Sequence, residues 1–225
     1  MQAMLNFSLE EKAKVLAFLE KFPAKETKTR FEEFRCRVGE STVTLYSTGK
    51  LVVQGRDSEK AKEKILKGVG LESELILGID EAGRGEAFGA LVVAAVLADS
   101  TKMRELRDSK KVKGIEAKRR LVEKNALATA VYVVEACEID SLRENGTNLN
   151  KIQARAINSL VESFSGRKEG FRVLVDGSPL EGARKGIEFI VKGDDKNAVI
   201  GAASVLAKSE RERHGKGIRK SWKKG

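Results

Sequence analysis

The apolar positions in the first part of the chain change from helical spacing to strict alternation and then back. The residues at helical spacing are Leu9, Ala13, Leu16 and Leu19. Ser8 and Glu11 have the separation of a capping box, so we expect a helix here that Pro23 closes. Between residues 31 and 53, apolar and polar residues alternate in three runs separated by turn-forming residues, which predicts a three-stranded meander. A second helix is expected over residues 57–66.

The rest of the chain alternates apolar runs of strand length with amphipathic stretches of helical spacing. The predicted strands are 75–80, 88–97, 129–138, 171–176 and 187–192. The predicted helices are 113–125, 149–164 and 196–213. This order favours an α/β fold, in which a mixed sheet carries helices on both faces. A change of composition at 68–74 divides the chain into two predicted domains, 1–70 and 71–225.

Composition narrows the class of protein. The 225 residues are 41% hydrophobic, enough for a proper core, and carry a formal charge of +10 with a pI near 9.6. The basic excess favours a polyanionic partner such as nucleic acid. The N-terminus has no signal or transit pattern, and no apolar run approaches the ~20 residues that a membrane span needs. We therefore expect a cytoplasmic monomer without membrane contact.

The few cysteines and histidines argue against several kinds of chemistry. Cys36 and Cys137 form no CxxC pair, and His214 is the sole histidine. A zinc site and a serine–histidine hydrolase are therefore not expected. The glycines after Glu81 lack the third glycine of a dinucleotide fingerprint, and no Gly-Lys-Ser/Thr follows them, so both nucleotide-loop interpretations are weak.

Candidate chemistry is concentrated where the strand 75–80 ends. Asp80 and Glu81 directly follow an apolar run, and Gly83-Arg84-Gly85 comes next. A strand end holds side chains rigidly, so carboxylates there can bind a metal ion or act as bases. The two glycines let the backbone approach a phosphate or sugar while Arg84 supplies charge. Two adjacent acids alone are more typical of a simple turn, but with this loop behind them we favour nucleic-acid chemistry.

A third acid, Asp176, ends a second predicted strand, and Glu212 on the closing helix is our candidate for a fourth. The carboxyl ends of parallel strands lie side by side, so Asp80, Glu81 and Asp176 are expected to converge. Clustered carboxylates repel one another unless cations neutralise them, and Mg²⁺ or Mn²⁺ prefer such oxygen ligands. Two of these ions can activate a water molecule and stabilise the leaving oxygen of a phosphodiester.

Five segments together resemble the type 2 ribonucleases H. They are GIDEAGRG at 78–85, the apolar strand after it, LRDSKK at 106–111, VDG at 175–177 and GAASVLAKSERER at 201–213. The resemblance implies a ribonuclease H-like mixed sheet flanked by helices. It also implies hydrolysis of the RNA strand of RNA/DNA hybrids with two divalent metal ions, leaving 3′-hydroxyl and 5′-phosphate ends.

The resemblance implies a role for each matching residue. The matches to the first three metal-binding acids of the family are Asp80, Glu81 and Asp176. The fourth falls on Glu212, with Glu181 as a rival. The loop Gly83-Arg84-Gly85 matches the one that senses the ribose 2′-hydroxyl. Other residues implied to contact the substrate or to support the acids are Lys110, Lys111, Ser204 and Lys208.

Further segments resemble the ribonuclease HIII branch of these enzymes. Residues 43–65 resemble one repeat of the TATA-binding-protein fold, and NLNKIQARAINSL at 148–160 is similar to the same branch. This implies a small α+β TATA-binding-protein-like domain whose sheet faces nucleic acid. The Gly-Tyr-Gly segment that reads the RNA–DNA junction in ribonuclease HII is not found after Arg213, so we expect inefficient removal of single embedded ribonucleotides.

The alternative to an enzyme is a non-catalytic protein of the same fold that binds RNA/DNA hybrids. A pure binder gains nothing from four carboxylates where phosphate must sit, because they repel phosphate unless metal is bound. The acids therefore favour the enzyme.

Overall fold

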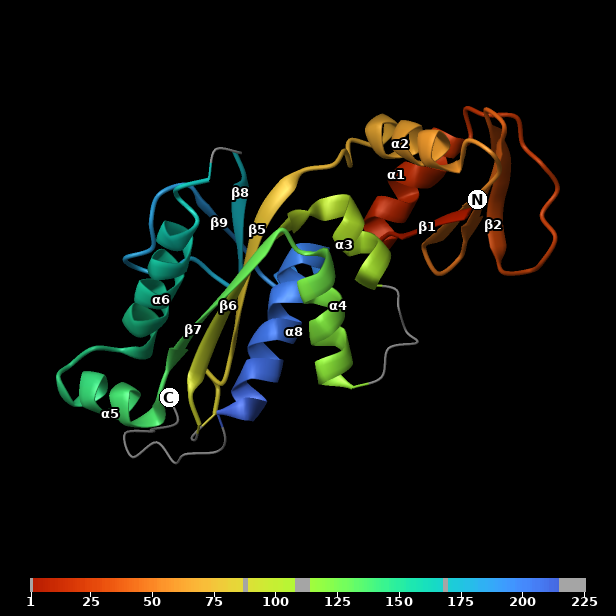
Figure 1. Cartoon of the computed structure of the whole chain (residues 1–225). Helices are drawn as coiled ribbons and strands as arrows, with labels where there is room; N and C mark the ends of the chain where they lie inside the picture. Colours follow the sequence, from red (N-terminus) through yellow and green to blue (C-terminus); the bar gives the residue numbers. More distant parts are fainter. Residues whose placement is uncertain (1, 87–88, 108–113, 168–169, 215–225) are drawn as a thin grey trace. The chain divides into compact units, whose positions relative to one another are not determined.

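The computed structural model describes residues 2–86, 89–107, 114–167 and 170–214 (Figure 1). The chain divides into two compact units, Met1–Ser73 and Glu74–Gly225. In the described ranges, no helix is both long and apolar enough to cross a membrane.

The first unit is a four-stranded antiparallel sheet with helices packed on one face (Figure 1). Its elements are β1 (Gln2–Asn6), α1 (Leu9–Leu19), β2 (Glu32–Val38), β3 (Ser41–Tyr46), β4 (Lys50–Gln54) and α2 (Ser58–Gly68). The strand order is β1-β4-β3-β2. Alternate strand residues point into a core that the two helices complete. This core includes Leu5, Val15, Leu19, Cys36, Val43, Leu45, Leu51, Val53 and Ile65.

The predicted capping box is present in this unit. The Ser8 hydroxyl accepts a hydrogen bond from the Glu11 amide, and the Glu11 carboxylate accepts one from the Ser8 amide. The expected meander is β2, β3 and β4. The strand β1 was not predicted; it exists because residues 2–6 pair with β4. Asp57 precedes α2, but its side chain makes no capping hydrogen bond.

The second unit is built on a five-stranded mixed sheet of order β7-β6-β5-β8-β9. Its strands are β5 (Leu75–Ala82), β6 (Leu91–Asp99), β7 (Ala128–Val134), β8 (Arg172–Asp176) and β9 (Ile187–Ile190). Its helices are α3 (Ser100–Arg107), α4 (Ile115–Asn125), α5 (Ala136–Glu144), α6 (Leu149–Ser163), α7 (Gly193–Lys196) and α8 (Ala198–Arg213). Strands β5, β6 and β7 pair antiparallel, whereas β5, β8 and β9 pair parallel.

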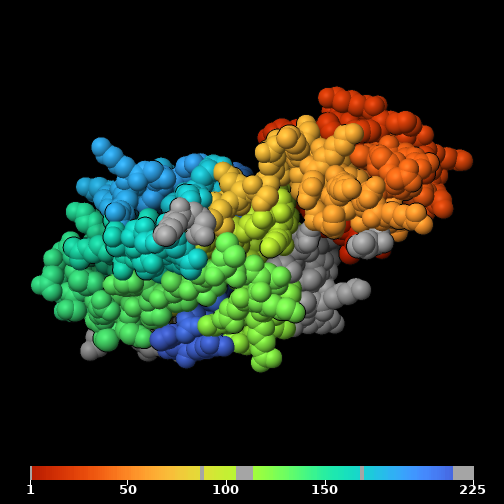
Figure 2. Space-filling view, turned by 45° about the horizontal axis from the view of Figure 1, so that its top comes forward, coloured from red at the N-terminus to blue at the C-terminus, as the bar shows by residue number. Residues whose placement is uncertain are grey.

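Helices cover both faces of this sheet, as the alternation of buried residues along β6 shows. Val92, Ala94 and Val96 pack toward the face that carries α3, α4 and α8. Val93, Ala95 and Leu97 pack toward the opposite face, which carries α5 and α6. Figure 1 shows α8 and α4 on one side of the strands and α6 on the other. In Figure 2, the visible part of α8 (blue) lies against α4 (green), in agreement with their contacts. Two covered faces explain why β6 is apolar along nearly its whole length.

Three predicted elements of the second unit differ from the structure. The predicted strand 129–138 ends at Val134, and helix α5 starts at Ala136 because Ile139 is drawn into the core on a helical face. The predicted strand 88–97 is β6, displaced to Leu91–Asp99. The start of the predicted helix 196–213 is divided at Asn197, which separates α7 from α8. Helix α3 was not predicted.

Helix α8 touches β5 at Gly78. A Cβ atom on Gly78 would lie 2.6 Å from the carbonyl carbon of Val199 and 2.7 Å from the amide nitrogen of Ile200. The Asn197 side chain caps this end of α8 by accepting hydrogen bonds from the amides of Val199 and Ile200. The first turn of α8 is thereby fixed against Gly78, which lies two residues before Asp80 on β5.

Candidate active site

The acids predicted at two strand ends are neighbours in the sheet. Strands β5 and β8 pair in parallel with Ile79 opposite Val175, and the next residue on each strand is an acid, Asp80 and Asp176. Successive side chains of a strand point to opposite faces. Asp80 interacts with Ser204 of α8 on one face, and Glu81 interacts with Gln153 of α6 on the other. Asp80 and Glu81 therefore lie near the carboxyl end of the central strand β5, on opposite faces of the sheet, one beside α8 and the other beside α6.

The carboxyl groups of Asp80 and Glu81 are held in a setting that disfavours their charge. Burial raises the pKa of Asp80 from 3.8 to about 6, and the charges of Asp176 and Asp194 add to the rise. Burial followed by the charge of Asp80 raises the pKa of Glu81 from 4.5 to about 7, although Arg84 acts in the opposite direction. Asp80 is 5% exposed, so little water is available to stabilise its charge. A bound cation would relieve this penalty.

Asp176 is oriented by the backbone of the segment that follows β9. One of its carboxylate oxygens accepts a hydrogen bond of 2.5 Å from the amide of Gly193. The next residue, Asp194, places its charge near Asp80. The sequence interpretation missed Asp194. Asp176 is the last residue of β8, whereas Asp194 lies in α7, four residues after the end of β9. The signal that could have identified Asp194 is its place near the carboxyl end of a strand that pairs in parallel with β8.

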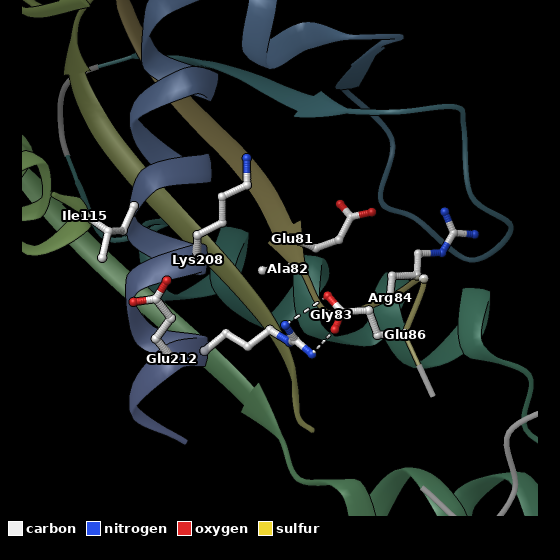
Figure 3. Close-up of a pocket in the computed structure, with 10 residues that line it drawn as sticks. Glu81, Ala82, Gly83, Arg84, Glu86, Ile115, Lys208 and Glu212 are labelled. Atoms are coloured by element: carbon white, nitrogen blue, oxygen red, sulfur yellow. Dashed lines mark hydrogen bonds and ion pairs between the residues drawn. The ribbon is translucent and has the colours of Figure 1, made fainter. Parts of the chain in front are cut away.

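Helix α8 supplies a row of polar residues beside the acids. Ser204, Lys208 and Glu212 are four residues apart and so share one face of the helix. The Ser204 hydroxyl is close enough to the Asp80 carboxylate to lower the pKa of Asp80. The contact does not have the geometry of a normal hydrogen bond, so the buried Ser204 oxygen has no hydrogen-bond partner in the structure. Glu212 is exposed, and in Figure 3 its carboxylate and that of Glu81 lie on either side of Lys208. Asp194, not Glu212, is among the charges that act on Asp80.

An open pocket of about 450 Å³ lies beside Glu81 (Figure 3). The loop Gly83-Arg84-Gly85 forms one wall, and Lys208, Arg211 and Glu212 of α8 form another. Arg84 donates a hydrogen bond to the side-chain oxygen of Asn150 on α6. A Cβ atom on Gly85 would meet nothing within 4 Å, so the backbone there is open to a ligand.

The sequence also predicted site roles for Glu181, Lys110 and Lys111. Glu181 is exposed in the loop after β8, which Asn158 holds to α6 by donating to the carbonyl of Gly182 and accepting from the amide of Arg184. Lys110 and Lys111 are outside the described residues. Within the described ranges, no three carboxylate, imidazole or thiol side chains are gathered as a complete metal site.

The donors near the acid pair fit a hard divalent cation. They are carboxylate oxygens, which Mg²⁺ and Mn²⁺ prefer. Two buried polar atoms beside them, the Ser204 hydroxyl oxygen and the Gln153 side-chain oxygen, have no hydrogen-bond partner in the structure. Buried polar atoms are normally satisfied by protein or by ordered water. These two are placed to interact with the water shell that a hydrated cation would bring.

Comparison with solved structures defines the class of protein. The Aquifex aeolicus RNase H3 structure is 25% identical, covers 94% of this chain and 85% of its own, and has a TM-score of 0.52. The Bst-RNase HIII structure in complex with Mn²⁺ covers 95% of this chain and 82% of its own at 19% identity, with a TM-score of 0.57, and shows the shared fold. The second unit is thus an α/β domain of the ribonuclease H type.

Sequence comparison then gives the family. The profile of ribonuclease HII matches residues 77–224. Ribonuclease HII of Francisella philomiragia is 38% identical over 143 residues, which are 61% of this chain and 72% of the relative. That of Hydrogenovibrio crunogenus is 37% identical over 147 residues, 64% of this chain and 67% of the relative. The chain belongs to the ribonuclease HII family. It is a metal-dependent ribonuclease H, an endonuclease of a family that acts on RNA/DNA hybrids.

Proposed function

We propose that the chain hydrolyses the RNA strand of RNA/DNA hybrids with two Mg²⁺ or Mn²⁺ ions, leaving 3′-hydroxyl and 5′-phosphate ends. The observation that carries this proposal is the group of acids at the ends of β5 and β8, where burial and mutual repulsion raise the pKa values of Asp80 and Glu81. Divalent ions supply a hydroxide nucleophile and stabilise charge on the phosphate.

In this proposal Asp80, Glu81, Asp176 and Asp194 hold the metal ions. Asp194 is preferred to Glu212 and Glu181 as the fourth acid because its charge acts on Asp80. The Gly193 amide fixes the orientation of Asp176, and Ser204 lies beside Asp80. Glu212 is at the rim of the pocket, where it limits how close a phosphate comes without metal.

The loop Gly83-Arg84-Gly85 is the proposed reader of the RNA strand. Its open backbone at Gly85 leaves peptide groups accessible to a ribose 2′-hydroxyl, the group that distinguishes RNA from DNA. Arg84 and Lys208 border the same pocket and are suited to bind the phosphates beside the cleaved bond. We further propose that a uniform hybrid is cleaved better than a duplex with one embedded ribonucleotide.

The first unit is proposed to be a TATA-binding-protein-like domain that adds affinity for the duplex, as in the ribonuclease HIII branch. The face of its sheet opposite α1 and α2 carries Arg37 on β2 and Lys50 on β4, alternating with the core residues of these strands. Arg35 lies on the same face but is half-buried and paired with Glu32 at 3.9 Å. Basic side chains such as Arg37 and Lys50 suit the phosphates of a duplex, and binding through them should weaken as salt rises.

One assay tests the activity and the substrate preference together. The protein is incubated with a uniform RNA/DNA hybrid and, separately, with a duplex that contains one ribonucleotide, in Mg²⁺, in Mn²⁺ and in chelator. We expect metal-dependent cleavage of the hybrid, with new 5′-phosphate ends, and slow cleavage of the second duplex. Equal rates on both would refute the proposed preference, and cleavage in chelator would refute the metal site.

A second experiment tests the first unit. Arg37→Gln combined with Lys50→Gln should weaken hybrid binding about 10-fold at moderate salt and reduce its salt dependence, because each phosphate contact releases counterions. The matched control is Lys14→Gln with Lys60→Gln, which removes two exposed lysines from α1 and α2. Equal loss in both double variants would show that only the total charge matters.

A further inference from the structure

The loop Gly83-Arg84-Gly85 is held from the α6 side through its arginine. Asn150 lies in the first turn of α6, whose N-terminus is capped by the Asn148 side chain bonding the Lys151 amide. The side-chain oxygen of Asn150 accepts a hydrogen bond from the Arg84 guanidinium. About one turn further along α6, Gln153 interacts with Glu81. Helix α6 therefore contacts both the loop and the acid that precedes it.

The same loop is held from the α8 side through the residue that follows it. Arg211 binds Glu86 with both arms of its guanidinium, at 3.0 and 2.9 Å (Figure 3, dashed lines). The Arg211 side chain is 18% exposed, so this ion pair is partly shielded from water. Its Nε also donates to the carbonyl of Ala90, the residue just before β6, at 3.4 Å. A forked, partly buried arginine is a rigid connection, because two parallel hydrogen bonds fix its orientation.

Gly83 lies directly against Arg211 and fits only as glycine. A Cβ atom there would be 2.4 Å from Nε of Arg211 and 2.3 Å from the carbonyl oxygen of Ala90. Its φ of +92° is also disfavoured for residues with a side chain. Arg211 therefore holds the loop at both ends. It packs against Gly83, the first loop residue, and it forms an ion pair with Glu86, which follows the last one.

We infer that Arg211 and Asn150 are positioning residues, which hold the loop between α8 and α6 so that Arg84 and the open backbone at Gly85 meet the RNA strand in a fixed geometry. This inference rests on the proposed contact between that loop and the hybrid. Misplacement of a substrate-contacting group by about 1 Å is enough to cost on the order of 10²-fold in rate.

A double-mutant cycle tests the α8 side. Arg211→Gln and Glu86→Gln should each raise the KM for a uniform hybrid about 10-fold, with a smaller change in kcat, and the double variant should be no worse than either single one. The matched control is the cycle of Arg172→Gln and Glu188→Gln, a forked ion pair between β8 and β9 outside the pocket. That control should leave KM unchanged. Additive losses at Arg211 and Glu86, or a fall in melting temperature with KM unchanged, would overturn the inference.

Two further variants test the α6 side and separate this inference from the proposed function. Asn150→Ala should raise KM about 10-fold, whereas Asn150→Asp keeps the acceptor oxygen and should remain within about 3-fold of the parent. If Arg84→Gln leaves KM unchanged, the loop does not contact the substrate and the proposed function fails at that point. If Arg84→Gln raises KM while the Arg211 and Asn150 variants do not, the proposed contact stands and the positioning role is wrong.

Discussion

Charged side chains lie at both ends of the parallel strands β5 and β8, but their surroundings differ. At the starting end, Arg172 hydrogen-bonds Glu74, just before β5, and Glu188 on β9. Its guanidinium lowers the pKa of Glu188. At the other end, burial and like charge raise the pKa values of Asp80 and Glu81. At the first end the carboxylates are paired with an arginine of the protein itself, whereas at the second we propose that bound metal ions compensate the carboxylates.

This contrast separates two kinds of charged group on one sheet: exposed ion pairs at one end and buried carboxylates at the other. Paired charges at an exposed edge contribute little to the free energy of unfolding, on the order of 0–1 kcal/mol. Clustered, buried carboxylates destabilise the metal-free fold and are best explained by the ligand that compensates for them. Variants at the two ends should therefore affect activity and stability in different directions.

The largest difference is expected for activity. Asp80→Asn should lower hybrid cleavage by more than about 10³-fold, because a lost metal ligand removes several kcal/mol of transition-state stabilisation. Glu188→Gln at the paired end should change it by less than about 2-fold. Steady-state cleavage of a uniform hybrid measures both. Retention of activity in the Asp80 variant would remove this residue from the site.

The next effect concerns the fourth acid. Asp194→Asn should lower cleavage by about 10²-fold, since Asp194 belongs to the group of charges around Asp80. Glu212→Gln and Glu181→Gln should each remain within a few-fold of the parent. A large loss only in one of these glutamate variants would assign the fourth position to that residue instead.

The acid-bearing end should also make the stability of the metal-free protein depend on pH. The folded-state pKa of Asp80 is raised from 3.8 to about 6, so the folded protein binds its proton more tightly than the unfolded chain. Between these values the free energy of unfolding therefore falls as pH rises, by about 2–3 kcal/mol for this group.

Urea unfolding at pH 5 and pH 8 in chelator measures about half of this loss, because the Asp80 carboxyl of the unfolded chain is already ionised at pH 5. Added Mg²⁺ should restore stability at pH 8. Asp80→Asn should be less sensitive to pH than the parent. Glu188 has a lowered pKa, so its contribution has the opposite sign: it is present above the ordinary glutamate pKa and is lost as pH falls. A parent protein that is more stable at pH 8 in chelator would contradict the assignment.

The smallest effect separates the two glycines of the loop. Gly83→Ala should destabilise the fold by about 2 kcal/mol, because alanine is strained at its positive φ and collides with Ala90 and Arg211. Gly85→Ala has open space and should change stability by less than about 1 kcal/mol. Equal thermal shifts in the two variants would show that the loop is not packed as the structure has it.

Much of the fold could be predicted from the sequence because burial leaves a periodic pattern. The helix behind Ser8, the meander and the strands around Asp80 and Asp176 all have such patterns. The pattern failed at Glu135, where the residues after it form a helix that buries Ile139 instead of continuing the strand, and for β1, which depends on its pairing with β4.

The candidate site was predictable only where chemistry follows a recognisable strand. Asp80 and Asp176 end apolar runs, whereas Asp194 follows a strand of four residues that gives a weak signal. Contacts such as Arg84 with Asn150 join residues that are 66 positions apart. No local spacing encodes them, so they became visible only in the structure.

The contact between Gly78 and the first turn of α8 has a consequence for how this protein tolerates change. A single methyl group at that point has no room, and the displaced helix would carry Ser204 and Lys208 away from the carboxylates. Gly78 is therefore one of the positions that tolerate substitution least, although it has no side chain and takes no part in the chemistry.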